Sequence, residues 1–170
     1  MHSVEVILDD DMDRKIRAEW AALAEAGLPS QARHTGASNR PHITLALSDT
    51  LTDDVARRLA AIMADLPIPV TLGGLLLFGT TRVVLARHVI SSAALLDLQS
   101  RVSAALADPV DPHHTFAAGR WTPHVTLARR LRPDQVGSAL THLDPLPPLP
   151  GELVRARRWD MAAKTEQWLQ

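Results

Sequence analysis

The sequence predicts an α+β fold made of two similar halves. Two short segments carry this prediction: residues 41–46 read Pro-His-Ile-Thr-Leu-Ala and residues 123–128 read Pro-His-Val-Thr-Leu-Ala. They lie almost half of the 170-residue chain apart. Strand and helix patterns recur in the same order around each segment, as an internal duplication requires. We therefore expect one domain, residues 1–170, with pseudo-repeat halves at about 1–80 and 81–170.

In the first half, a strand is expected over residues 3–9, where apolar side chains alternate along the chain. The acidic run Asp9–Asp13 favours the start of a helix, which Gly27 and Pro29 end at about residue 26. The remaining elements expected in this half are a loop at residues 30–40, a strand at 41–47, a helix at 52–66 and a strand at 70–78.

In the second half, Gly79-Thr80-Thr81 separates two apolar strands and predicts a hairpin. Ser91 and Ser92 cap a helix whose leucine and valine side chains share one face. The elements expected in this half are strands at residues 82–89, 123–130, 153–159 and 165–169, helices at 91–106 and 133–143, a loop at 108–121 and a proline-rich link at 145–150.

The composition limits the possible ligands and locations. There is no cysteine, so disulfides and thiolate metal sites are excluded. The net charge is −1, whereas proteins that grip duplex nucleic acid usually carry a basic face. No apolar run approaches the roughly 20 residues that span a bilayer, and the first residues lack a signal-peptide pattern. We expect a cytoplasmic monomer that binds a small phosphate ester or an RNA end, without duplex or membrane contacts.

The two His-x-Thr motifs indicate acid–base chemistry on a phosphate. Alternation along a strand puts His42 and Thr44 on one face, and likewise His124 and Thr126. If a pseudo-two-fold axis relates the halves, both polar faces line one cleft. One neutral imidazole then accepts a proton from the attacking water, and one imidazolium protonates the leaving oxygen. The threonine hydroxyls can bind the non-bridging oxygens. This scheme needs no metal and no cofactor.

At these two hexapeptides the sequence resembles the two-histidine (2H) phosphoesterase superfamily, in its bacterial 2′-5′ RNA ligase-like, RNA 2′,3′-cyclic phosphodiesterase branch. The resemblance implies a bilobal fold with two antiparallel sheets facing a central cleft and helices packed outside. It also implies metal-independent hydrolysis of 2′,3′-cyclic phosphates of nucleotides or RNA ends to 2′-phosphomonoesters. Carried over by motif, His42 and His124 are the catalytic pair, and Thr44 and Thr126 bind phosphate.

Further candidates flank the second motif. Strict alternation puts Arg130 on the face of His124, whereas relatives often carry a basic residue at position 129, and a β-bulge would reconcile the two. Either Arg129 or Arg130 is expected to contact phosphate. Trp121 is a candidate for stacking on a base, and Phe116 is the second choice in the same loop, but packing in the core or the loop is the favoured role of both. Arg40, just before the first motif, is a candidate for the mouth of the cleft.

Several alternatives remain open at this stage. The adjacent pair His113 and His114 could suggest a metal site, but neighbouring residues on a loop are poor joint ligands. Within the enzyme class, the alternative is a 2′-5′ RNA ligase or phosphodiesterase activity. Outside it, the same cleft could serve a non-catalytic module that binds nucleotides or RNA ends. The sequence does not show which histidine is the acid and which is the base.

Overall fold

The computed structural model describes residues 1–106, 109–111 and 116–169, and it confirms the α+β class. The strands are β1 (His2–Leu8), β2 (His42–Ser48), β3 (Ile68–Phe78), β4 (Val83–Val89), β5 (Pro109–Val110), β6 (His124–Leu131), β7 (Leu149–Asp160) and β8 (Thr165–Trp168). The helices are α1 (Asp10–Glu25), α2 (Asp53–Met63), α3 (Ala93–Ala105) and α4 (Val136–His142), with 3-10 turns η1 (Gln31–Arg33) and η2 (Pro133–Gln135).

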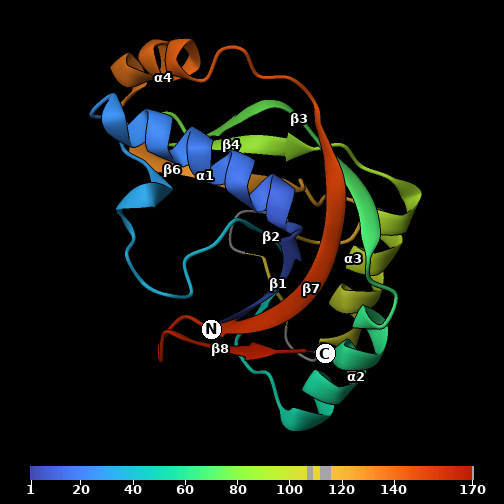
Figure 1. Ribbon diagram of the computed structural model, residues 1–170. Helices are drawn as coiled ribbons and strands as arrows, with labels where there is room; N and C mark the ends of the chain where they lie inside the picture. The colour runs from blue at the N-terminus through green and yellow to red at the C-terminus, as the bar shows by residue number, and fades with distance from the viewer. Residues whose placement is uncertain (107–108, 112–115, 170) are drawn as a thin grey trace.

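The strands form one antiparallel sheet in the order β1-β2-β6-β4-β3-β7-β8, and β1 also pairs with β7. The family resemblance implied two antiparallel sheets. The structure shows that these two layers are joined into one continuous sheet. The sheets are joined because β7 has 12 residues, enough to pair with β3 along its first part and with β1 along its second. Figure 1 shows β7 curving from one layer into the other. On the opposite side, β2 and β6 meet at a single pair, Ile43 and Val125.

The strand pairings follow a two-fold scheme. The β1–β2 pair of the first half corresponds to the β4–β6 pair of the second. The β1–β7 pair corresponds to the β4–β3 pair, and each of these joins a strand of one half to a strand of the other. The β2–β6 and β3–β7 pairs join equivalent strands across the junction. Ile43 and Val125, which pair with each other, hold the same place in the two hexapeptides. This scheme supports our proposal that the halves at about 1–80 and 81–170 arose by duplication.

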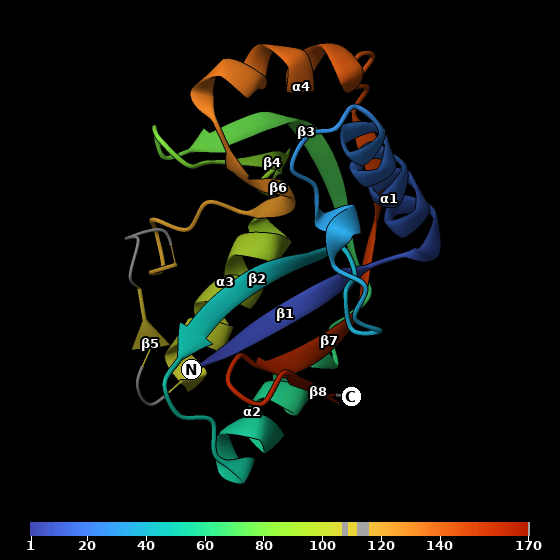
Figure 2. The ribbon, with the colours of Figure 1, turned by 90° about the vertical axis from the view of Figure 1, so that its left-hand side faces the viewer.

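The helices cover the apolar side of the strands (Figure 2). Helix α1 packs against β6 and β7, α3 packs against β2 and β3, and α2 packs against α3. The carboxylate of Asp9 caps α1 by accepting from the backbone N–H of Met12 at 2.8 Å, as the acidic run predicts. Two buried polar side chains, Trp20 of α1 and Gln99 of α3, donate hydrogen bonds to carbonyl groups of β6 and β2.

Alternation along the two motif strands follows the prediction. The side chains of Ile43, Leu45, Val125 and Leu127 are fully buried, because they face the helices. The histidines and threonines between them are only partly buried and face the other way. Burying these four apolar side chains contributes roughly 1.5–3 kcal/mol each, which fixes the register of the polar face. None of the described helices is long and apolar enough to cross a membrane.

Candidate active site

The two His-x-Thr motifs meet where β2 joins β6. Around the antiparallel Ile43–Val125 pair, His42 comes beside Thr126 and Thr44 comes beside His124. All four side chains line one cavity of about 330 Å³. The rest of its lining comes from the β3–β4 hairpin, from the end of β6 and from the segment before β6: Phe78, Gly79, Arg82, Val84, Phe116 and Arg129. The predicted convergence of the two motifs on one cleft therefore occurs.

Both histidines are oriented in the same way by backbone carbonyls. Nδ1 of His42 lies 2.8 Å from the carbonyl oxygen of Arg40, and Nδ1 of His124 lies 2.7 Å from that of Thr122. A carbonyl oxygen only accepts, so we assign the proton of each neutral ring to Nδ1. This assignment leaves both Nε2 atoms free to accept a proton or, in the imidazolium form, to donate one.

His42 stands beside a buried carboxylate. Its Nε2 lies 3.7 Å from Oε1 of Glu5, and its side chain stays 29% exposed, so a ligand can still reach the ring. Glu5 is buried, and it accepts hydrogen bonds from Ser3 at 2.6 Å and from Arg157 at 2.8 Å. Burial raises the pKa of Glu5, but the positive charges of His42 and Arg157 and the bonds from Ser3 and Arg157 bring the pKa below its ordinary value. Glu5 is therefore ionised and places a negative charge beside the ring of His42.

His124 has the opposite surroundings. Its ring packs against Phe78 with a centroid separation of 4.8 Å and a tilt of 50°. Burial lowers the pKa of His124, the hydrogen bond with Thr122 opposes this, and the charges of Arg129 and His42 lower the pKa further. The net effect is a pKa below the ordinary value, so His124 is neutral near pH 7. The two equivalent imidazoles thus have different surroundings, a carboxylate at His42 and a phenyl ring with nearby positive charge at His124.

A β-bulge decides between the two arginines after the second motif. Ala128 pairs with Leu85 and Leu131 pairs with Val83, so β6 carries one residue more than β4 in this stretch. Arg130 takes φ = 64°, the left-handed conformation that a bulge residue adopts. Both arginines are exposed, but Arg129 lines the cleft and Arg130 is not among the lining residues. Because of the bulge, Arg129 and not Arg130 lies on the cleft side of the strand, the reverse of what strict alternation assigns.

Trp121 does not line the cleft, so of its two predicted roles the structure shows packing and not stacking on a base. Its side chain is buried in the core, and its indole N–H donates to the carbonyl oxygen of Thr44 at 3.1 Å. The indole of Trp20 donates in the same manner to the carbonyl oxygen of Thr126, also at 3.1 Å. These two tryptophans therefore support the backbone of the motif strands from behind. Phe116, the second aromatic candidate, lines the cleft instead.

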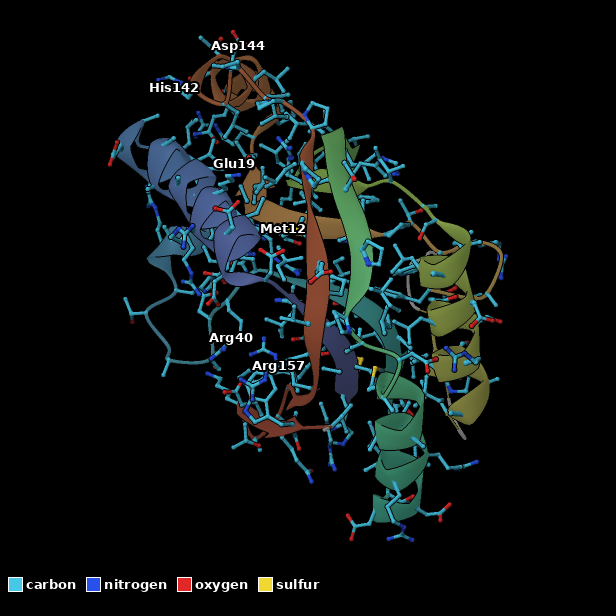
Figure 3. The ribbon with its side chains drawn as sticks, turned by 45° about the vertical axis from the view of Figure 1, so that its right-hand side comes forward. Met12, Glu19, Arg40, His142, Asp144 and Arg157 are labelled. Carbon is cyan, nitrogen blue, oxygen red and sulfur yellow. The ribbon has the colours of Figure 1, made fainter. Side chains whose placement is uncertain are left out.

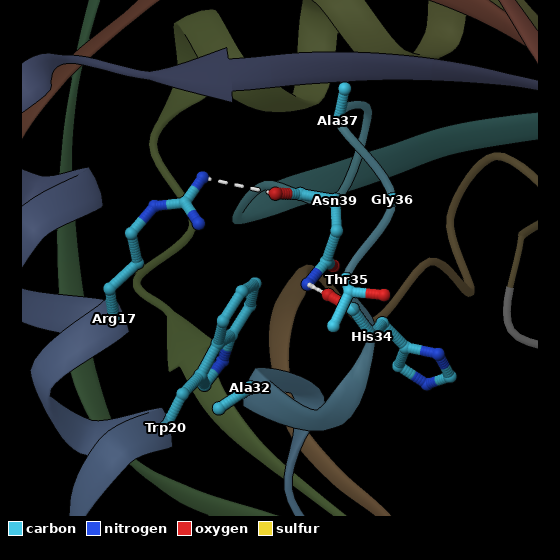
Figure 4. A pocket seen from close by; sticks show the side chains of 8 residues that line it. All are labelled: Arg17, Trp20, Ala32, His34, Thr35, Gly36, Ala37 and Asn39. Atoms are coloured by element: carbon cyan, nitrogen blue, oxygen red, sulfur yellow. Dashed lines mark hydrogen bonds between the residues drawn. The ribbon is translucent and has the colours of Figure 1, made fainter.

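A larger hollow of about 400 Å³ lies elsewhere, between α1 and the segment before β2 (Figure 4). Arg17 crosses it and donates to the carbonyl oxygen of Asn39 at 3.1 Å, while Asp13 pairs with the same guanidinium. Neither motif histidine contributes to this hollow, so the cleft remains the candidate site. Within the described ranges no cluster of His, Asp and Glu could hold a metal ion. His113 and His114 lie outside the described residues.

Comparison with known proteins agrees with this site. The profile of the 2′-5′ RNA ligase superfamily matches residues 12–164. The chain belongs to this superfamily. The resemblance seen in the two hexapeptides is thereby confirmed. No curated protein is similar enough in sequence to count as a match.

Usb1 and LigT are among the solved structures that share the fold of this chain. Usb1 from Kluyveromyces marxianus is 16% identical with a TM-score of 0.61, and the alignment covers 99% of this chain and 96% of that one. LigT from E. coli, complexed with 3′-AMP, is 16% identical with a TM-score of 0.54, over 98% of this chain and 91% of that one. At such low identity these likenesses show the fold alone.

Sequence reasoning missed three residues that shape the cleft: Glu5, Phe78 and Arg82. A signal existed for Glu5, because it is a charged residue inside an otherwise apolar strand. For Phe78 and Arg82 the only signal was their place at the ends of a predicted hairpin. Loops between strands commonly carry functional residues, but nothing local indicates that this hairpin turns toward the motifs.

Proposed function

We propose that this protein is a metal-independent cyclic phosphodiesterase, which hydrolyses 2′,3′-cyclic phosphates of nucleotides or RNA ends to 2′-phosphomonoesters. The observation that carries the proposal is the cleft in which both His-x-Thr motifs face one cavity, with a carboxylate beside His42 and a phenyl ring against His124. Membership of the 2′-5′ RNA ligase superfamily supports chemistry on phosphodiesters. The fold neighbour LigT has been solved with 3′-AMP, and Usb1 with uridine monophosphate, so nucleotides are bound by proteins of this shape.

In the proposed reaction, His124 is the base and His42 is the acid. Neutral His124 accepts a proton through Nε2 from a water molecule, whose oxygen attacks the phosphorus. The bond between phosphorus and O3′ breaks, and the imidazolium of His42 gives its Nε2 proton to O3′. The product carries its phosphate on O2′. Afterwards His124 is protonated and His42 is neutral, so proton exchange with solvent restores the starting state.

Hydrogen bonds and charge complete the proposed mechanism. The hydroxyls of Thr44 and Thr126 bind the non-bridging oxygens, on which negative charge accumulates in the transition state. Arg129 and Arg82 add positive charge at the same cavity, on the side of His124. Glu5 lies at the other end, where its carboxylate stands beside His42. Positive charge at one end of the cavity and a carboxylate at the other best match an anion whose leaving oxygen points toward His42.

The other candidate functions have less support. A non-catalytic binding module has no need for two imidazoles in one cavity, since one cation would bind phosphate equally well. A 2′-5′ RNA ligase or phosphodiesterase would use the same four motif residues, so the cleft alone does not favour it. The single observation that points to the cyclic substrate is the family resemblance of the motifs.

Turnover of defined substrates in EDTA tests the proposal. We expect the wild-type protein to hydrolyse 2′,3′-cyclic nucleotides, or a short RNA ending in a cyclic phosphate, and to yield only the 2′-phosphate. Thr44→Ala combined with Thr126→Ala is expected to lower kcat, because it removes donors to the transition state. A 3′-phosphate product would reverse the proposed direction of ring opening. Activity that EDTA abolishes and a divalent ion restores would refute the metal-independent mechanism.

A further inference from the structure

The sheet face that bears His42 continues away from the cleft, across β1, β7 and β8. In the pairing register, Ile7 of β1 is the partner of both His42 and Arg155. Directly opposed residues on a sheet share a face, so Arg155 belongs to the same face as His42. Two strand spacings of roughly 4.8 Å separate them, which gives about 10 Å between their backbones. Arg155 is therefore within one nucleotide or so of the proposed reaction centre.

The neighbouring row of this face leads to an aromatic side chain on β8. Thr44 pairs with Glu5, Glu5 pairs with Arg157, and Arg157 pairs with Trp168. The guanidinium of Arg155 lies 3.9 Å from the centroid of the Trp168 ring. That of Arg40 lies 5.3 Å from the same ring. Trp168 thus holds two cationic groups on the face that carries the catalytic motif.

Arg40 joins this cluster to the cleft. Its carbonyl oxygen accepts from Nδ1 of His42, while its side chain extends to Trp168. Figure 3 shows Arg40 and Arg157 close together beside the end of β7. Both contact Glu166, but Arg40 only at 3.8 Å, whereas Arg157 donates to it at 2.6 Å. Nε of Arg40 is buried and has no hydrogen-bond partner among the described residues.

The charges of this cluster are only partly balanced. Arg157 is neutralised by Glu5 and Glu166. Arg155 is exposed, and no ion pair joins it to any carboxylate in the described part of the chain. A guanidinium that is ordered by a ring and lacks a counter-ion is suited to a phosphate group, which it can bind through two parallel N–H donors.

We propose that Arg155, Arg40 and Trp168 form a second anion subsite, which holds the phosphodiester group next to the reacting end of a single-stranded RNA. This inference rests on the proposed function and names its substrate class: an oligonucleotide end instead of a free cyclic nucleotide. The net charge of −1 does not oppose it, because the positive charge is local to this face. Guanidinium planes and aromatic rings are also the groups on which unpaired bases of RNA stack.

The test compares two substrates and two arginine variants. Arg155→Ala is expected to leave kcat/KM for a 2′,3′-cyclic mononucleotide unchanged. For a short RNA ending in a 2′,3′-cyclic phosphate, it is expected to raise KM and lower kcat/KM about tenfold, because one charge-assisted contact is lost. The matched control is Arg158→Ala, which removes the same charge three residues further along β7, on the opposite face.

Salt dependence gives a second readout. The slope of log(kcat/KM) against log[salt] for the RNA substrate should become shallower by about 0.7 in Arg155→Ala, as expected for one lost phosphate contact. Arg158→Ala should keep the wild-type slope. Equal losses on both substrates, or equal losses in both variants, would overturn the subsite and leave the proposed hydrolysis intact.

Failure of the proposed function is recognised separately. If the wild-type protein hydrolyses neither substrate, the cyclic phosphodiesterase proposal falls. Fluorescence anisotropy then measures binding of a labelled single-stranded RNA with a 3′-phosphate, and this binding decides whether the subsite exists. Weaker binding by Arg155→Ala, with Arg158→Ala unaffected, supports it. Equal binding by all three proteins refutes it.

Discussion

At the residue scale, the two motif histidines differ in what surrounds their rings. His42 lies 3.7 Å from the carboxylate of Glu5, whereas His124 packs against Phe78 and close to the charge of Arg129. Since a carboxylate stabilises an imidazolium and burial destabilises it, the motifs are equal in sequence but unequal in chemistry. This inequality is the basis for assigning His42 as the acid and His124 as the base.

A sulfur leaving group tests that assignment. Replacing O3′ of the cyclic substrate by sulfur creates a leaving group that departs as a thiolate and needs no proton. His42→Ala should lose about 10²–10⁴ in rate on the oxygen substrate, the usual contribution of an acid or base, and recover most of it on the sulfur substrate. His124→Ala should stay slow on both. Single-turnover rates provide the measurement, and recovery by His124→Ala instead would reverse the roles.

Local sequence predicted the histidines but not the partner of His42. The His-x-Thr spacing fixes which side chains share a face, because that depends only on alternation along a strand. The contact with Glu5 depends on how β1 pairs with β2 across some 40 residues of chain, and the register shift between Val4 and Glu5 further changes which residues oppose each other. For Trp121 two roles stayed open, stacking on a base and packing, because local sequence shows where the residue lies in the chain but not whether it is buried.

At the element scale, the bulge in β6 separates two neighbouring arginines. Arg129 lines the cleft and Arg130 is exposed outside it. A bulge was one way to reconcile the alternation with the family pattern, but the residues themselves do not show it. The bulge arises because β6 has three steps between Ala128 and Leu131 while its partner β4 has two between Leu85 and Val83. This difference in length is a property of the β4–β6 pair and not of either strand alone, so it could not be predicted from local sequence.

The two arginines therefore make a matched pair of variants. Arg129→Ala should lower kcat/KM by roughly 10- to 100-fold, since a charge-assisted contact to phosphate contributes about 1.5–3 kcal/mol. Arg130→Ala should change it by less than a factor of about 3, because Arg130 lies outside the cleft. Steady-state kinetics on the cyclic substrate gives both values. A larger loss for Arg130→Ala would show that the bulge does not hold during catalysis.

Local sequence patterns did not predict where strand β7 begins. The proline-rich link was expected to end at residue 150 and the strand to begin near 153, yet β7 begins at Leu149 and includes Pro150. The proline pairs with Thr71 of β3, so tertiary pairing extends the strand beyond what its own residues favour. This extension is what joins the two layers of the sheet, and it could not be predicted from composition.

At the scale of the whole molecule, a buried ion pair connects the two halves. Arg87 of β4 is 1% exposed, and its Nη1 lies 3.3 Å from Oε1 of Glu19 on α1. Burial raises the pKa of Glu19 from 4.5 to about 7, although Arg87 opposes this, and burial also lowers the pKa of Arg87. Figure 3 shows Glu19 on the inner side of α1. The cost of burial therefore exceeds the attraction between the two groups.

This pair predicts how stability depends on pH. Since the pKa of Glu19 is higher in the folded than in the unfolded protein, its contribution to stability is complete below pH 4.5 and is lost as the pH rises through about 7. Glu19→Gln removes that titration. Urea unfolding at pH 5 and pH 8 should show a smaller loss of stability in Glu19→Gln than in the wild type. Identical losses would mean that Glu19 is ionised throughout this range.

The most direct test of the account is the effect of each histidine alone and of both together on hydrolysis of a 2′,3′-cyclic phosphate in EDTA. His42→Ala and His124→Ala should each lower kcat by about 10²–10⁴, and each should remove one limb of a bell-shaped pH profile. The double variant should be little worse than the slower single one, because the two groups act in one step. Two folded single variants that keep wild-type turnover would contradict the two-histidine mechanism.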